Sequence, residues 1–449
     1  MHARLMGVRV AALLLILLCA SAVEAQERVL SLREALAYAG TGNPELRAFE
    51  RSVLGQREDV DIARSFLLPK LFFEERFMRT NNPTYAFMAK LNQARFEQSD
   101  FAISSLDHPP AINDFQTGLF FEQPLFVPRA YIAVDMATIE AAAKDEEFVR
   151  KKEDVAFRVL KYYLGVRTAK EYAGVSEKAL DDAKAHLRIA ESRFNSGLGL
   201  YSDKLRAEVA VLSAEEKLVS ARKNLEVAKR ALGLTLGLAE SIDITRERPS
   251  FDVKDREYYD KAALSRKDLR SLEARYRNAE NSLKLANAGY LPILGFGGSY
   301  QANSHRSPFG GEGDSWQLSA FLRWEIFDGT KREHERHKAQ QAIAETAEHI
   351  DGLKKQISFM VYDAYLGVDE AKKGLELAVA SVKSAEEGRR LVLARYENSL
   401  STLVDLLDVQ MNLDAARAGV ADKEGAYLTA IANLGFQSGT LLQDLRLRK

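Results

Sequence analysis

The chain has 449 residues, with 63 lysines and arginines against 64 aspartates and glutamates, so its formal net charge is −1. Without a basic excess there is no electrostatic reason to bind a polyanion, and we expect no nucleic-acid partner. The sequence contains one cysteine, Cys19, near its start. The rest of the chain therefore has no disulfide, no thiolate metal site and no cysteine nucleophile.

The first 25 residues have the pattern of a secretory signal peptide. Arg4 and Arg9 precede an apolar run over residues 11–22, and small side chains place cleavage after Ala22 or Ala25. The run is too short to span a membrane as a helix, and no later run of about 18 apolar residues follows it. Any membrane crossing would therefore be made by β-strands.

The remaining sequence is a tandem duplication. A shift of 223 positions aligns Leu46 with Leu269 and Pro69 with Pro292, and a shift of 202 later aligns residues 163–166 with 365–368. The shifts differ because one loop of the first copy is about twenty residues longer. We predict a first repeat over 26–240, a connecting segment over 241–256 and a second repeat over 257–449.

Each repeat begins with a helix, at 43–67 and 268–290, that leads into a strand hairpin, at 70–126 and 292–327. In the second hairpin, apolar side chains alternate with mostly polar ones from Trp316 to Ile326. About ten alternating residues with aromatic residues near the ends are typical of a strand that crosses an outer membrane. The four expected strands are 71–78, 115–126, 293–301 and 316–326.

A very long helix follows each hairpin, at 129–195 and 330–398. Both segments lack proline between their ends and are rich in helix-forming residues. At about 1.5 Å per residue each helix is roughly 100 Å long, far more than a small domain needs. Val155, Val159 and Tyr163 form a narrow apolar stripe that recurs in the second copy. Such a helix needs antiparallel neighbours, and we expect return helices at 202–236 and 402–437.

Four strands cannot close a membrane barrel, because the smallest bacterial barrels use eight. Unpaired strand edges are not tolerated in lipid, so several copies must share one barrel. Two copies would supply eight strands and three would supply twelve. The strand pattern alone leaves this choice open.

The turns over 193–198 and 395–400, together with Val404-Asp405-Leu406-Leu407-Asp408, carry a family resemblance. The sequence resembles the TolC family of outer-membrane efflux factors over essentially its whole length after the signal peptide. The resemblance implies a mainly α fold with a membrane β-barrel: a homotrimer whose shared 12-stranded barrel continues into a 12-helix periplasmic α-barrel. It also implies a Gram-negative outer-membrane location, with lipid around the barrel.

The function implied by the resemblance is that of a passive conduit. Such a channel-tunnel serves tripartite efflux or type I secretion and is joined by a periplasmic adaptor to an inner-membrane transporter. Transport through it requires no chemistry by the conduit itself. We therefore expect no catalytic residues and no cofactor.

Asp405 and Asp408 are the strongest candidates for a functional site. They lie three positions apart at the start of a helix, so both carboxylates share one face. One interpretation is that they offset the helix dipole, which is worth about 0.3 to 1 kcal/mol. The resemblance favours another, in which they line the closed periplasmic aperture. The first copy has Asp203 at the position of Asp405 but Arg206 at that of Asp408.

The resemblance also implies a latch and a pair of docking turns. Tyr396 occupies the position of a latch tyrosine, whereas Ser401 stands where an arginine is expected, which leaves Arg206 or Lys204 as replacements. The adaptor would dock on the two helical turns, although a helix C-cap accounts for the glycine equally well. The docking candidates are Gly197, Leu198, Ser399 and Leu400.

Two other classes of function fit the sequence less well. A soluble periplasmic coiled-coil scaffold or adaptor would leave the apolar face of 316–326 without a core. A metal site is conceivable at His334 and His337, with His349 further along, but their charged neighbours are typical of a solvated helix start. We expect no metal and no enzymatic activity.

Overall fold

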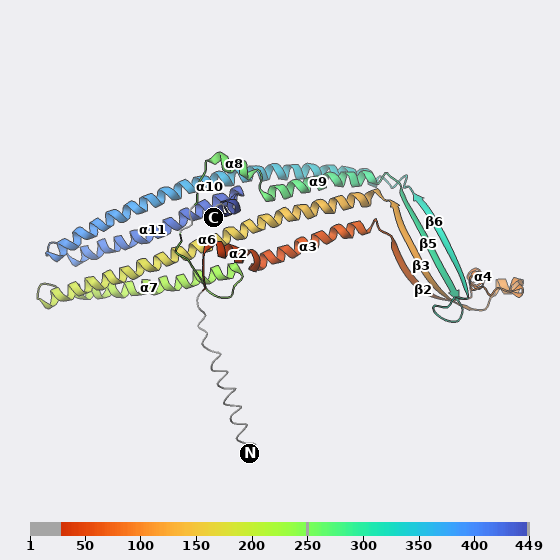
Figure 1. Cartoon of the computed structure of the whole chain (residues 1–449), viewed down its shortest axis with the longest axis horizontal. Coiled ribbons are helices and arrows are strands. Elements are labelled where there is room, and N and C mark those ends of the chain that lie inside the picture. Colours follow the sequence, from red (N-terminus) through yellow and green to blue (C-terminus); the bar gives the residue numbers. More distant parts are fainter. Residues whose placement is uncertain (1–27, 248–250, 447–449) are drawn as a thin grey trace, which may run out of the picture. The chain divides into compact units, whose positions relative to one another are not determined.

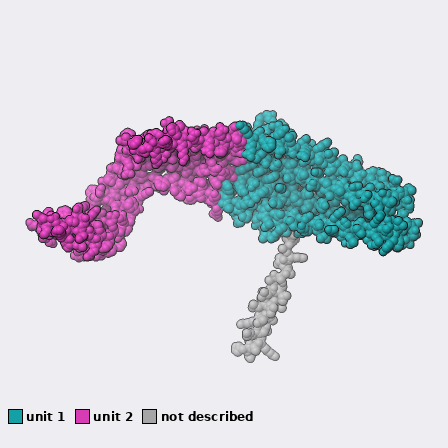
Figure 2. Space-filling model, turned by 180° about the vertical axis from the view of Figure 1, so that it is seen from behind, with its two compact units in different colours: residues 1–50, 148–267, 354–449 teal, residues 51–147, 268–353 magenta. Residues whose placement is uncertain are grey.

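The computed structural model describes residues 28–247 and 251–446; the expected signal peptide lies outside them. The described chain is mainly α-helical (Figure 1). It divides into two compact units, which Figure 2 colours separately. Unit 1 comprises residues up to 50, 148–267 and from 354, and unit 2 comprises 51–147 and 268–353. Each unit thus draws on both sequence repeats. Among the described helices, none has the length and apolar composition needed to cross a membrane.

Four long helices form most of unit 1. They are α6 (Pro128–Asn195), α7 (Tyr201–Leu236), α10 (Lys331–Glu397) and α11 (Leu403–Ser438), with α6 and α10 beginning in unit 2. The sequence places the same helices at 129–195, 202–236, 330–398 and 402–437. Within unit 1 they lie in the order α7, α6, α11, α10 (Figure 1).

Two apolar stripes on α6 put it at the centre of this layer. Val159 and Tyr163 pack with Leu232 of α7 in one buried cluster. Leu160 and Leu164, one position further around α6, pack with Leu428 and Ala432 of α11 in another. Burial on both flanks explains why the helix persists over 68 residues, since its packed faces and not its isolated propensity stabilise it.

The residue before each leading helix binds the end of a return helix. Asn43 lies between α7 and α3 (Pro44–Ser65): its amide nitrogen donates to Thr235 O at 2.7 Å, and its Oδ1 accepts from Leu46 N at 3.1 Å. The 223-residue shift places Arg266 at the equivalent joint before α9 (Lys267–Ala288), where it donates to Gln437 O at 2.9 Å. The orphan carbonyls of each helix end thereby find a partner.

Several short elements were not anticipated from the sequence. β1 (Arg28–Leu30) pairs in parallel with β4 (Ile242–Ile244), which lies in the connecting segment. Strands of three residues are too short to show a hydrophobic period, so the pattern gave no signal. The remaining short helices of unit 1 are α2 (Leu32–Gly42), α8 (Arg256–Ala263) and α12 (Leu441–Arg446).

Unit 2 contains one antiparallel sheet in the order β2-β3-β5-β6. Each repeat supplies one hairpin, and β3 pairs with β5 to join the two. The long connection between β2 and β3 carries three short helices. These elements are β2 (Lys70–Thr80), α4 (Pro83–Asn92), η1 (Gln98–Phe101), α5 (Ile103–Asp107), β3 (Ile112–Phe126), β5 (Ile293–Ser304) and β6 (Gly313–Arg323).

The last strand is shorter than the alternation suggests. β6 ends at Arg323, although the alternating pattern continues to Ile326. Beyond the strand, Arg332 of α10 donates to Glu325 O and Ile326 O, both at 2.9 Å. These carbonyls therefore serve the start of α10 and not a strand ladder.

The duplication supplies a matched stability test. A Cβ at Gly233 of α7 would lie 2.0 Å from Glu240 O, whereas one at the equivalent Gly435 of α11 would lie 3.4 Å from its nearest neighbour. We predict that Gly233→Ala destabilises the protein by about 1 to 3 kcal/mol through overpacking. Gly435→Ala should be neutral or gain up to about 1 kcal/mol from helix propensity. Thermal unfolding followed by circular dichroism measures both, and equal midpoints would contradict the packing described.

Candidate gate at the helical turns

Two turns with the same geometry close the helix pairs of unit 1. In the first turn, residues 196–200, Gly197 has φ of +72°, and Leu198 N donates to Arg193 O at 2.9 Å. In the second turn, residues 398–402, Ser399 has φ of +60°, and Leu400 N donates to Arg395 O at 2.8 Å. These are helix C-caps with a left-handed residue. The leucine of each turn is exposed.

Arg193 holds the two helix pairs together at this end. Its guanidinium donates to Tyr396 O and to Ser399 Oγ, both at 2.8 Å, and lies 4.9 Å from the centroid of the Tyr396 ring. The Ser399 hydroxyl explains why a serine occupies a left-handed position that normally favours glycine. Tyr396 is buried, and this burial raises the pKa of its phenol.

The arginine that serves Tyr396 is therefore not one of the two expected replacements. Lys204 pairs with Glu191 and Glu208, at 3.5 and 3.7 Å. Arg206 is exposed and makes no hydrogen bond or ion pair with any described residue. Arg193 differs from the two expected replacements in its place: it lies at the end of α6, before the first turn, whereas Lys204 and Arg206 follow that turn on α7.

Asp405 has a structural role at the start of α11 that is more specific than the dipole effect considered from the sequence. Its carboxylate accepts from Thr402 N at 2.9 Å and from Ser401 Oγ at 2.9 Å, while Asp405 N donates to Thr402 Oγ1, which completes a capping box at the start of α11. The Thr402 backbone bond is the largest cause of the lowered pKa of Asp405. Asp408, one turn further, is exposed and has no hydrogen bond or ion pair with the described chain.

The equivalent start of α7 is built differently. Its N-cap is Leu200, whose side chain makes no capping bond. Asp203 lies close enough to Tyr396 for its charge to contribute to the raised pKa of that phenol. The structure thus brings Asp203, Arg193 and Tyr396 together, and leaves Arg206 exposed.

A buried polar network that sequence reasoning missed crosses three helices above the turns. Gln410 of α11 accepts from Arg389 Nε of α10 at 3.1 Å, and its amide nitrogen donates to Asp182 at 3.2 Å and Asp414 at 2.9 Å. These partners fix the orientation of the Gln410 amide, because arginine only donates and carboxylates only accept. His186 Nε2 lies 3.3 Å from the Gln410 oxygen and must donate to it.

With the Nε2 hydrogen directed at Gln410, Nδ1 is the nitrogen that is unprotonated in neutral His186. This nitrogen is buried and has no hydrogen-bond partner among the described residues. A second proton there would create a buried positive charge beside Arg389. Burial is the main cause of the lowered pKa of His186, and it also raises the pKa of Asp414.

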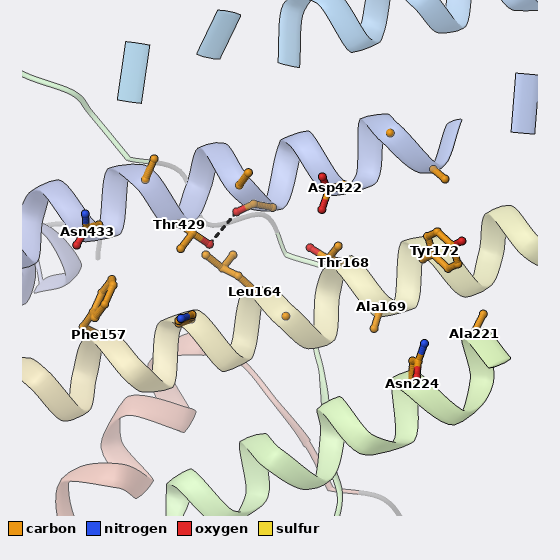
Figure 3. Close-up of a pocket in the computed structure, with 17 residues that line it drawn as sticks. Phe157, Leu164, Thr168, Ala169, Tyr172, Ala221, Asn224, Asp422, Thr429 and Asn433 are labelled. Atoms are coloured by element: carbon orange, nitrogen blue, oxygen red, sulfur yellow. Dashed lines mark hydrogen bonds between the residues drawn. The ribbon is translucent and has the colours of Figure 1, made fainter. Parts of the chain in front are cut away.

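Two grooves run along α6 between α7 and α11. The groove near the turns has a volume of about 840 Å³ and is lined by Arg206 and Asp408 among others. The second, of about 1140 Å³, is drawn in Figure 3; small and polar side chains such as Thr168, Asn224 and Thr429 line it. Both grooves include Tyr172 and Ala418, so they continue one another on one face of the layer.

The histidines singled out in the sequence do not assemble a metal centre. Within the described ranges, no group of three or more histidine, cysteine, aspartate or glutamate side chains has the geometry to hold a metal ion. His349 lies 3.8 Å from Glu345, an exposed pair one helical turn apart.

Solved structures of outer-membrane proteins have the same fold as this chain. The chain is similar to VceC from Vibrio cholerae, with a TM-score of 0.74, 17% identity and coverage of 91% of this chain and 96% of that one. It is similar to CusC with a TM-score of 0.75, 15% identity and coverage of 92% of each chain. These likenesses establish the fold.

The sequence comparisons establish the family. The family model described as outer membrane efflux protein matches residues 34–238 and 258–440, and the chain belongs to this family. It is 22% identical to the outer membrane protein TolC of Vibrio cholerae, over 77% of this chain and 81% of that protein. It is 23% identical to the alkaline protease secretion protein AprF of Pseudomonas aeruginosa, over 73% and 70%. The family resemblance and the outer-membrane location expected from the sequence are confirmed.

The His186 network predicts a specific pH dependence. Because the folded-state pKa of His186 lies below its ordinary value of 6.5, the unfolded chain takes up the proton first, and stability falls as the pH drops below about 6.5. We predict that the free energy of unfolding of the native protein falls more between pH 7.5 and 5.5 than that of His186→Gln. The difference is bounded at about 1.4 kcal/mol per pH unit.

Asp414 works in the opposite direction, since its raised pKa adds stability as the pH falls. Both proteins retain Asp414, so its contribution cancels in the comparison. Denaturant titrations across this pH range provide the measurement. Parallel pH profiles for the two proteins would show that His186 is not held neutral by the fold.

Proposed function

We propose that this protein is the outer-membrane conduit of a tripartite efflux or type I secretion system. It acts as a homotrimer that passes substrates delivered by an inner-membrane transporter through a periplasmic adaptor. The observation that carries this proposal is the four-helix layer with paired turns in a chain of the outer membrane efflux protein family. The relatives of this chain include the outer membrane efflux protein BepC of Brucella suis and the alkaline protease secretion protein AprF.

Exposed apolar stripes on the two edge helices support association into a ring. α7 and α10 form the edges of the layer, and each carries large apolar side chains on the surface at helical spacing. Pairing α7 of one copy with α10 of the next would bury both stripes, as side-by-side helices do elsewhere in the layer. The stripes are Leu205, Val209, Leu212, Val219, Val227 and Leu234 on α7, and Phe359, Tyr362, Leu366, Leu377 and Leu391 on α10.

The sheet of unit 2 supports the membrane part of the proposal. Trp316, Leu318 and Leu322 share one face of β6 and are 64 to 73% exposed. A sheet of four strands with an apolar, uncovered face suits contact with lipid once its edges are paired. Three copies would supply the twelve strands of a shared barrel.

The two turns are proposed as the docking surface for the adaptor. Leu198 and Leu400 lie at the tips of the helix pairs and are 74 and 71% exposed. Burying these apolar side chains against a partner would be favourable. Gly197 and Ser399 give both turns the same backbone shape. An apolar hairpin tip could therefore meet equivalent sites around the ring.

Asp408 is proposed as the main carboxylate of the aperture. It is exposed and unpaired within the described chain, whereas Asp405 is engaged in capping α11. Threefold symmetry would place three copies of each carboxylate around the bore, where they attract cations and repel anions. Arg206, on α7 in the same groove, would moderate this field and Asp203 would add to it, while Arg193 and Tyr396 hold the turns together.

Neutralising the aperture should weaken block by cations. We predict that Asp408→Asn raises the half-blocking concentration of a divalent or polyvalent cation roughly tenfold, or about 1.4 kcal/mol per bound ion. Asp405→Asn should act more weakly on block and should also loosen the start of α11. Planar-bilayer recordings on purified protein provide the measurement, with Asp363→Asn on α10 as the charge-matched control. Unchanged block in Asp408→Asn would remove this residue from the aperture.

A further inference from the structure

The two repeats place identical arginines at identical positions. Arg193 lies two residues before the end of α6, and the 202-residue shift places Arg395 two residues before the end of α10. The turns that follow share their left-handed residue and their closing hydrogen bonds. The two arginine side chains therefore start from equivalent backbone positions.

Their surroundings within one chain differ. The Arg193 side chain reaches from α6 to the second turn, where it covers Tyr396 and binds Ser399. The Arg395 side chain is exposed and makes no hydrogen bond or ion pair with the described chain, although its charge helps to lower the pKa of Asp405. One arginine is used, and its counterpart is not.

The residues at the first turn that correspond to the partners of Arg193 are also exposed. The shift maps Tyr396 onto Phe194 and Ser399 onto Gly197. Tyr396 is 4% exposed beneath Arg193, whereas Phe194 is 38% exposed. Phe194 O accepts only the turn bond from Gly197 N among the described residues, and a carbonyl has a second lone pair.

We propose that Arg395 clamps the first turn of a neighbouring copy of this chain, as Arg193 clamps the second turn of its own. The guanidinium of Arg395 donates to Phe194 O of that copy and covers the Phe194 ring. In a closed ring the first and second turns alternate, so the step from the second turn to the next copy's first turn repeats the step within a chain. This inference rests on the proposed homotrimer and adds a named contact to it.

The two clamps would not be equally strong. Gly197 has no hydroxyl, so the contact between copies lacks the bond that Ser399 gives within the chain, and a phenylalanine ring replaces the tyrosine ring. The joints between copies would therefore be the weaker ones. Three weaker and three stronger joints would alternate around the ring.

Thiol cross-linking tests this directly, because the chain after the expected signal peptide has no cysteine. Arg395→Cys with Ser196→Cys forms the test pair, and Arg193→Cys with Asn398→Cys forms the matched control, since Asn398 is equivalent to Ser196. Both pairs are treated with a short bismaleimide in the intact, detergent-purified protein. The mass of the native protein, without cross-linker, is measured alongside by light scattering.

We expect the control pair to link within one chain and migrate as a monomer on a denaturing gel. The test pair should give covalent dimers and trimers. A trimeric mass without covalent oligomers from the test pair would overturn the Arg395 contact and leave the conduit intact. A monomeric mass would overturn the proposed function and the contact together, and failure of the control pair as well would overturn the clamp geometry.

Discussion

Burial of α6 on two flanks is the constraint on which the rest of the structure depends. One stripe of this helix packs on α7 and the adjacent stripe packs on α11. A helix that packs on both sides lies inside a layer. Each of its neighbours must pack against a further helix or form an edge of the layer. α11 finds α10 near the turns, which leaves α7 and α10 with apolar surface that their own chain does not cover. The proposed ring of copies would cover both apolar edges.

The same constraint fixes what happens at the turns. Because the layer brings the end of α6 near the end of α10, Arg193 can reach the second turn and hold it with hydrogen bonds and a ring contact. Charge-assisted bonds of this kind are stronger than neutral ones. The turns are thus tied in pairs within a chain. The duplication then supplies a second arginine, and the polar network around His186 joins three of the four helices a few turns above.

Much of the fold was predictable because the sequence contains two copies of the same pattern of elements. The long helices, the return helices and the hairpins follow from periodicity and missing prolines, and the structure places them within a few residues of the expected ranges. β1 and β4 were not predicted because strands of three residues are too short to show a hydrophobic period. The predicted end of β6, at Ile326, was too late because side-chain alternation does not show which donors bind the backbone carbonyls. Arg332 donates to two of these carbonyls, those of Glu325 and Ile326.

The positions of the two helical turns were predictable from the sequence, but the contacts of their residues were not. The sequence located the turns and the acidic pair, yet it could not show that Asp405 is spent on a capping box while Asp408 is free. The sequence pointed to Lys204 or Arg206, after the first turn, as the partner of Tyr396, whereas Arg193, before that turn on α6, makes the contact. Contacts between repeats depend on which helices lie side by side, and spacing along one helix does not reveal this.

The central claim is that copies of this chain complete one another's edges in a closed ring. Single-particle electron microscopy of the purified protein tests it most directly. The account predicts threefold particles in which α7 of each copy lies against α10 of the next, with both apolar stripes buried. Isolated single chains, or rings in which these two helices remain exposed, would contradict it.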